Sequence, residues 1–162
     1  MYKNQILQEI DREWERFLGV AKGFSDKELR IKGAVGYWNT LEALLHLAAW
    51  NEEQVDVIKS YMSDGEERDY GDNEAIDLFN AQQVYEKRGL TPDQAWGHLH
   101  HTHETLLSFL NGLPEDAFKP DSHLINAMNV HMTAGAFSDH YRGHVDDLER
   151  FKSSIPYICS LD

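Results

Sequence analysis

The stretch WNTLEALLHLAAW, residues 38–50, predicts the start of a long and largely buried helix. Asn39 and Glu42 have the spacing of a capping box, in which each side chain accepts a hydrogen bond from the other residue's backbone N–H. Apolar residues then recur at helical spacing and give the helix a wide buried face. They are Leu41, Leu44, Leu45, Ala48, Val55, Ile58 and Met62.

The same apolar periodicity predicts three more long helices, over about residues 3–22, 91–111 and 130–153. Thr91 and Gln94 form a second capping-box pattern at the start of the 91–111 helix. The apolar stripe of the 130–153 helix consists of Val130, Ala134, Phe137, Tyr141, Leu148 and Phe151.

Four long amphipathic helices without a strand pattern predict an all-α fold, a four-helix bundle. The connection between the second and third long helices contains a short helix of its own, over about residues 74–88. Because this connection is long enough to cross the bundle, up-down-down-up order is favoured over up-down-up-down. We expect one domain, residues 1–155, followed by a tail over residues 156–162.

The amino-acid composition makes some binding partners of this protein unfavourable. Lys and Arg total 15 against 28 Asp and Glu, and the formal net charge of −13 repels nucleic-acid backbones and anionic membranes. No apolar run is long enough to span a bilayer. A single cysteine, Cys159, cannot build a disulfide framework, and we expect a cytoplasmic protein.

The most informative polar residues are His140 and His144. Their four-residue spacing places both imidazoles on one helix face, about 6 Å apart at Cβ, so that both can bind one metal ion. The alternative is a pair of histidines hydrogen-bonded at the rim of the apolar stripe. A zinc protease of the His-Glu-x-x-His type is disfavoured, because Tyr141 follows His140.

His46 is the natural third ligand. It lies about two turns into its helix, at a depth that allows it to meet the His140/His144 pair. A lone histidine in an apolar run is more often a core residue than a ligand. Three histidines with an open fourth position would describe a catalytic rather than a structural metal site.

The remaining motifs carry weaker signals. His98, His100 and His101 point in different directions on one helix and are expected to be solvated. His103 joins the apolar stripe of that helix and is interpreted as a core histidine, with a supporting role beside the metal site as the alternative. The acidic residues 64–74 lack the oxygen pattern of an EF-hand loop and predict a solvated connection.

Several segments resemble the DinB-like superfamily, which includes YfiT-type proteins. Residues 38–50 resemble its second-helix signature, and His140-Tyr-Arg-Gly-His144 resembles its last-helix signature. Residues 79–82 and 107–113 are similar to members related to ClbS/DfsB proteins.

This resemblance implies an up-down-down-up bundle, a homodimer, and a divalent metal, zinc or nickel, on His46, His140 and His144. It also implies relatives that are metal-dependent transferases using low-molecular-weight thiols, or hydrolases. ClbS-related members often lack the full histidine triad, whereas this chain keeps it, so its substrate is expected to differ from theirs.

Two functions remain open from the sequence. The first is a metal-dependent enzyme acting on a small molecule, with Trp50 and Tyr141 lining the pocket and Asp139 or Asp147 orienting an imidazole. The second is a dimeric bundle that binds a small molecule without turnover. A structural dimer with a vestigial site is a third and simpler interpretation.

Overall fold

The computed structural model describes residues 2–65, 68–122, 124 and 137–159. Over these ranges the chain forms five α-helices and no strand. They are α1 (Tyr2–Ala21), α2 (Thr40–Asp64), α3 (Asn73–Glu86), α4 (Pro92–Gly112) and α6 (Ser138–Ile158). Two short 3₁₀ helices, η1 (Glu28–Arg30) and η2 (Glu115–Phe118), lie in the connections.

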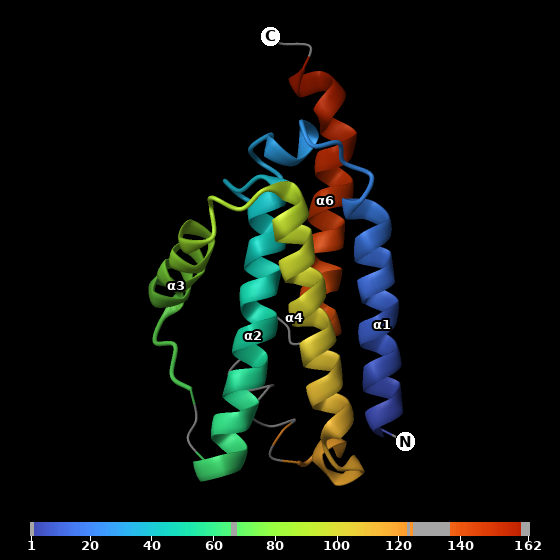
Figure 1. Cartoon of the computed structure of the whole chain (residues 1–162), viewed down its shortest axis with the longest axis vertical. Helices are drawn as coiled ribbons and strands as arrows, with labels where there is room; N and C mark the ends of the chain where they lie inside the picture. Colours follow the sequence, from blue (N-terminus) through green and yellow to red (C-terminus); the bar gives the residue numbers. More distant parts are fainter. Residues whose placement is uncertain (1, 66–67, 123, 125–136, 160–162) are drawn as a thin grey trace.

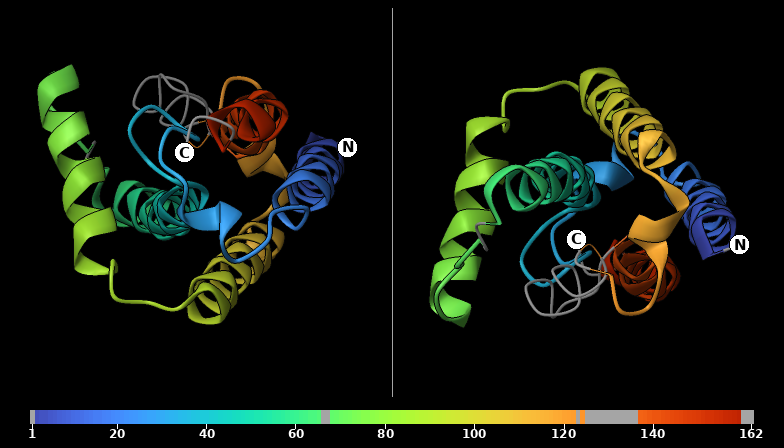
Figure 2. Two further views of the ribbon diagram at one scale, coloured as in Figure 1. Left: turned by 90° about the horizontal axis from the view of Figure 1, so that it is seen from above. Right: turned by 90° about the horizontal axis from the view of Figure 1, so that it is seen from below.

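Four of these helices form a bundle with up-down-down-up order, as the sequence predicted. In Figure 1, α1 and α6 run upward, whereas α2 and α4 run downward. The closest pairings are α2 with α4 and α1 with α6. The shorter α3 belongs to the crossover and lies outside the bundle beside α2 (Figures 1 and 2).

Capping explains where two of the helices begin. The Asn39 side chain accepts a hydrogen bond from the Glu42 N–H at 2.8 Å, and Glu42 accepts one from the Asn39 N–H at 2.8 Å. Thr91 and Gln94 make the same reciprocal pair at the start of α4. Both capping boxes confirm the sequence prediction. Helix α2 ends at Asp64 and is followed by Gly65, whose φ of 73° is the left-handed conformation that glycine adopts readily.

A single core fills the centre of the bundle, and the predicted apolar faces supply most of it. Ile10, Leu44, Leu99 and Leu148 are fully buried, one from each bundle helix. The prediction for Met62 is wrong, because its side chain is 53% exposed. Met62 lies in the last turn of α2, and this end of the helix is at the lower end of the bundle (Figure 1).

The last helix differs from its prediction at both ends. It begins at Ser138 rather than near Val130, because Phe137 has a φ of 52° and cannot continue a right-handed helix. Residues 130 and 134 of the expected stripe lie outside the described residues. The helix also continues past Ser153 to Ile158 and contains Pro156 in its final turn. No helix among the described residues combines the length and apolarity that crossing a membrane requires.

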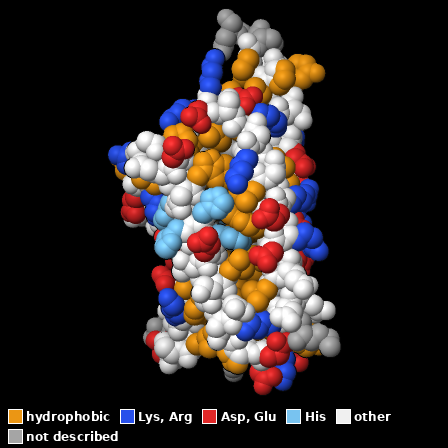
Figure 3. Space-filling view, turned by 45° about the vertical axis from the view of Figure 1, so that its right-hand side comes forward, with side chains coloured by type: hydrophobic (Ala, Val, Ile, Leu, Met, Phe, Trp, Pro, Cys, Tyr) orange, Lys and Arg blue, Asp and Glu red, His pale blue; other side chains and the backbone are white. Residues whose placement is uncertain are grey.

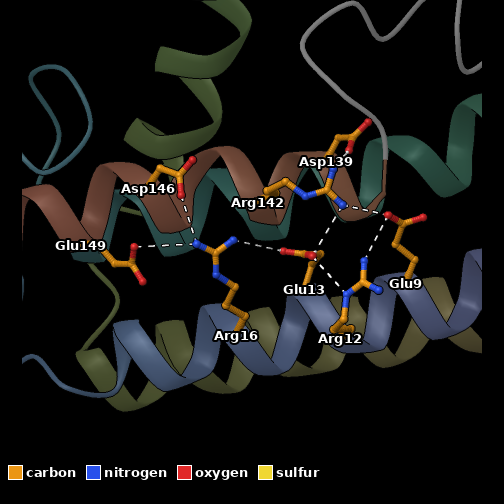
Figure 4. A network of polar contacts seen from close by, with 8 residues as sticks. All are labelled: Glu9, Arg12, Glu13, Arg16, Asp139, Arg142, Asp146 and Glu149. Atoms are coloured by element: carbon orange, nitrogen blue, oxygen red, sulfur yellow. Dashed lines mark hydrogen bonds and ion pairs between the residues drawn. The ribbon is translucent and has the colours of Figure 1, made fainter.

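Ion pairs join α1 to α6 along one side of the bundle (Figure 4). At their centre Glu13, with only 7% of its side chain exposed, lies 3.4 Å from Arg12, 3.7 Å from Arg16 and 3.5 Å from Arg142. Arg16 also reaches Asp146 at 3.2 Å. Because Arg142 and Asp146 belong to α6, the network fixes α6 against α1.

Replacing Glu13 should destabilise the fold more than replacing an exposed member of the same network. We expect Glu13→Ala to lower the free energy of unfolding by about 1–3 kcal/mol, because it removes a buried acceptor from charged donors. Asp146→Ala, at a side chain that is 63% exposed, should cost about 0–1 kcal/mol. Urea unfolding of the wild type and the two variants measures both changes in the free energy of unfolding. Equal losses of stability in Glu13→Ala and Asp146→Ala would contradict a central role for Glu13.

Candidate metal centre

Three histidines from two helices converge at one point inside the bundle. The Nε2 atom of His140 lies 3.0 Å from Nε2 of His46 and 3.2 Å from Nε2 of His144. One ligand nitrogen from each residue lies within 4.8 Å of the other two. The structure therefore brings together the three residues that the sequence singled out as metal ligands.

The helix geometry accounts for this convergence. His140 and His144 are four residues apart on α6, so they share one face. Helix α2 runs antiparallel to α6 (Figure 1), and His46 lies about two turns from its start. Because α6 begins at Ser138, His140 is in the first turn of its helix rather than deep within it.

Hydrogen bonds among the three rings cannot satisfy all of these nitrogens. A neutral imidazole nitrogen carries either one proton or one lone pair. The Nε2 atom of His140 faces two other Nε2 atoms and has capacity for one conventional partner. Nitrogen ligands that lie 2.0–2.1 Å from a tetrahedral ion are about 3.3 Å from one another. The Nε2 atom of His140 lies at nearly this distance from the Nε2 atoms of His46 and His144, at 3.0 and 3.2 Å. The donor set therefore fits a shared ion.

The surroundings keep the three imidazoles neutral. Burial, and after it the charge of His144, lowers the pKa of His46 to about 3. Burial also holds the pKa of His140 well below its usual value, and His144 and His46 add to this. The pKa of His144 is lowered by burial against the opposing effect of Asp147. Neutral imidazoles have free lone pairs, which metal binding requires.

Of the two carboxylates proposed to orient an imidazole, Asp147 is the one beside the triad. Its Oδ2 atom lies 3.7 Å from Nδ1 of His144, slightly beyond hydrogen-bond distance. Asp147 also pairs with Arg150 at 3.0 Å. Asp139 instead binds Arg142 at 2.6 Å, and Arg142 in turn reaches Glu9 of α1 (Figure 4).

Tryptophan rings border the triad. The Trp38 ring centre lies 4.8 Å from that of His46. The Trp50 ring lies 6.4 Å from His46 and 6.3 Å from His140. Trp50 thus lies beside the triad, where a pocket residue was expected. Trp38 was not predicted as a site residue, although it opens the same sequence signature.

Residues of the crossover, in α3 and just before it, also contact the Trp50 ring. The indole N–H of Trp50 donates to Oδ1 of Asn80 at 2.7 Å. The rings of Tyr70 and Phe79 pack on Trp50 at 5.5 and 5.3 Å. The crossover between α2 and α4 therefore contributes to the wall of the site.

Comparison with known protein families matches residues 9–146 to the DinB superfamily. The chain belongs to the DinB superfamily. The matched range includes all three histidines, and the bundle topology agrees with the family assignment. Comparisons with curated proteins and with solved structures gave no match.

Tyr141 does not face the histidine triad of this DinB-superfamily site, in contrast to its predicted role in lining the pocket. It is 1% exposed, and its hydroxyl group lies 2.9 Å from Nδ2 of Asn51 and 2.9 Å from Nδ1 of His103. Successive residues on a helix are turned by about 100°, so the residue after His140 points into the core. His103 is buried as expected and stacks on Trp14 at 4.0 Å.

The other histidines of α4 are less solvated than the sequence suggested. His101 is exposed as expected, but His98 and His100 are half-buried. His98 lies 3.7 Å from Glu52 of α2, and the His100 ring meets Trp14 edge-on at 5.2 Å. Figure 3 shows histidine side chains gathered about half-way along one face of the molecule. Since α4 packs against both α1 and α2, only part of its histidine cluster reaches solvent.

His103 should make the stability of the metal-free protein depend on pH. Burial, with a contribution from His100, lowers its pKa to about 4 in the folded protein. The unfolded chain, with an ordinary pKa near 6.5, takes up the proton first. Stability is therefore complete above about pH 6.5 and falls between pH 6.5 and 4, by up to about 1.4 kcal/mol per pH unit.

The variant His103→Asn isolates this contribution, because the amide replaces Nδ1 as a partner for Tyr141 and does not titrate. Urea unfolding in the presence of a chelator, at several pH values, should give a shallower acid decline for the variant. Parallel declines in the two proteins would show that His103 does not carry the effect.

Proposed function

We propose that this protein is a divalent-metal-dependent enzyme that acts on a small molecule. The observation that supports the proposal is the convergence of His46, His140 and His144 through their Nε2 atoms. Three protein ligands with an open fourth position are typical of catalytic rather than structural metal sites. Zinc and nickel are the proposed ions, since both accept imidazole ligands.

The ion supplies a Lewis acid that lowers the pKa of a group entering its open position. The protein's own residues prepare the site. Burial keeps His46 and His140 unprotonated near neutral pH. The rings of Trp38 and Trp50 pack beside the His46 imidazole. Electrostatic interactions are stronger in such a buried site than in water.

Two reaction classes suit such a site. In the first, a low-molecular-weight thiol is the co-substrate; its sulfur loses a proton and forms a bond to an electrophilic carbon of the small molecule, while a leaving group departs with the electrons of the bond that breaks. In the second, water is the nucleophile and the reaction is a hydrolysis. The net charge of −13 makes a nucleic-acid substrate unfavourable for either class. We propose that the active form is a homodimer in the cytoplasm.

Binding without turnover is the second candidate function. The observation that favours it is the aromatic wall beside the triad, where Trp50 is supported by Tyr70 and Phe79. Such a wall can hold an apolar molecule without any metal chemistry. In a thermal shift assay, stabilisation by small molecules but not by divalent ions would favour this function over the enzyme.

The enzyme proposal predicts one divalent ion per chain, and its loss in His140→Ala. The variant removes the nitrogen that faces both other ligands, so metal content should fall close to zero. His101→Ala removes an exposed histidine of α4 and should leave the metal content unchanged. Elemental analysis of protein purified without an affinity tag measures the stoichiometry. A full equivalent of metal in His140→Ala would refute the three-histidine site.

A further inference from the structure

A buried glutamine on α2 holds the chain where α6 begins. Gln54 is 1% exposed, and its Oε1 atom accepts a hydrogen bond from the Phe137 N–H at 2.9 Å. Its Nε2 atom donates to the Trp50 carbonyl oxygen at 3.1 Å, which fixes the orientation of the amide. Both polar ends of the side chain are therefore engaged, and the side chain links α2 to the residue before α6.

The backbone at Phe137 is strained. Its φ of 52° and ψ of −116° lie in a region that glycine adopts readily and that side chains with a Cβ avoid. Strain of this kind persists only where the surroundings enforce it, and it concentrates at functional sites. Among the described residues, the only side chain that forms a hydrogen bond with the Phe137 backbone is Gln54, which accepts from the Phe137 N–H.

Gln54 lies on the same side of α2 as the candidate metal ligand His46. His46, Trp50 and Gln54 follow one another at four-residue spacing along α2, so they lie on one side of the helix. Because α6 is antiparallel to α2, the Gln54–Phe137 contact lies about two turns beyond His46 along α2 and about one turn before His140 along the chain that leads into α6.

Few contacts fix α6 against α2. Helix α6 packs far more extensively on α1 than on α2. Apart from the imidazole contacts, the polar links between α2 and the α6 region are the Asn51–Tyr141 and Gln54–Phe137 hydrogen bonds among the described residues. These two hydrogen bonds are therefore the direct polar contacts, apart from the imidazoles, that help to set the position of His140 relative to His46.

We propose that Gln54 is a positioning residue of the metal site. By holding the strained backbone of Phe137, it sets the first turn of α6 and brings Nε2 of His140 to the point where the other two imidazoles converge. This inference rests on the proposed metal-binding function and adds to it a residue that does not touch the ion.

The test compares zinc affinity in Gln54→Met and in Ile58→Val. Methionine has nearly the same shape as glutamine but cannot accept the Phe137 hydrogen bond. Ile58 is a buried residue one turn further along α2, and its replacement by valine mildly destabilises the same helix while leaving both partners of the Gln54–Phe137 hydrogen bond in place. Zinc affinity is measured by competition with a chromophoric chelator, and the ligand geometry is measured from the visible spectrum of the cobalt-substituted protein.

We expect Gln54→Met to bind zinc at least about 10-fold more weakly than the wild type, as for other residues that orient metal ligands. Its cobalt spectrum should also shift, whereas Ile58→Val should keep the wild-type affinity and spectrum. Wild-type behaviour in Gln54→Met would overturn the inference, and so would equal losses in both variants, since those would reflect stability alone.

A measurement on the wild type covers the case in which Gln54→Met does not fold. Zinc should slow hydrogen exchange of the Phe137 amide, because coupling between two sites is reciprocal. An exchange rate that zinc does not change would overturn the positioning role. If the wild type binds no zinc at all, the proposed function fails, which is a different outcome from normal zinc binding by Gln54→Met.

Discussion

The structure depends on one constraint, the meeting of three neutral imidazoles between two antiparallel helices. The Nε2 atom of His140 cannot satisfy both His46 and His144 by hydrogen bonding. Burial lowers the pKa values of His46 and His140 well below their usual value, so protonation near neutral pH does not resolve the conflict. A shared divalent ion resolves it, since each nitrogen can then contribute its lone pair. The free protein therefore leaves a polar conflict at this point, which the proposed ion would remove.

Several parts of the fold serve to hold α6 where this meeting requires it. The Glu13 network fixes one side of α6 against α1 (Figure 4). The hydroxyl group of Tyr141 links the middle of the bundle through Asn51 of α2 and His103 of α4. Gln54 holds the start of the helix. These contacts come from three different helices. They explain how His140 can have a defined position although it lies in the first turn of α6.

The sequence was most informative where the signal is local. The capping boxes at Asn39 and Thr91 depend on residues three apart, and the structure has both. The His140/His144 spacing predicted a shared face, the depth of His46 in its helix made it the candidate third ligand, and the family resemblance favoured all three. Prediction was wrong where tertiary contacts decide. Helix α6 begins after Phe137, whose positive φ is held by a hydrogen bond to Gln54 of α2. No pattern in the sequence around residue 137 indicates this conformation. The sequence did contain one indication that Gln54 is important: it is a polar residue within the apolar face of the helix predicted for residues 39–62, and it is buried in the structure.

The central claim is that these three histidines bind one ion together, and X-ray absorption spectroscopy of the zinc-loaded protein tests it most directly. The account predicts three imidazole nitrogens around each zinc ion, at about 2.0–2.1 Å. In His46→Ala one of these imidazole contributions should disappear from the spectrum. A sulfur neighbour at about 2.3 Å, or a wild-type spectrum that His46→Ala leaves unchanged, would contradict the account.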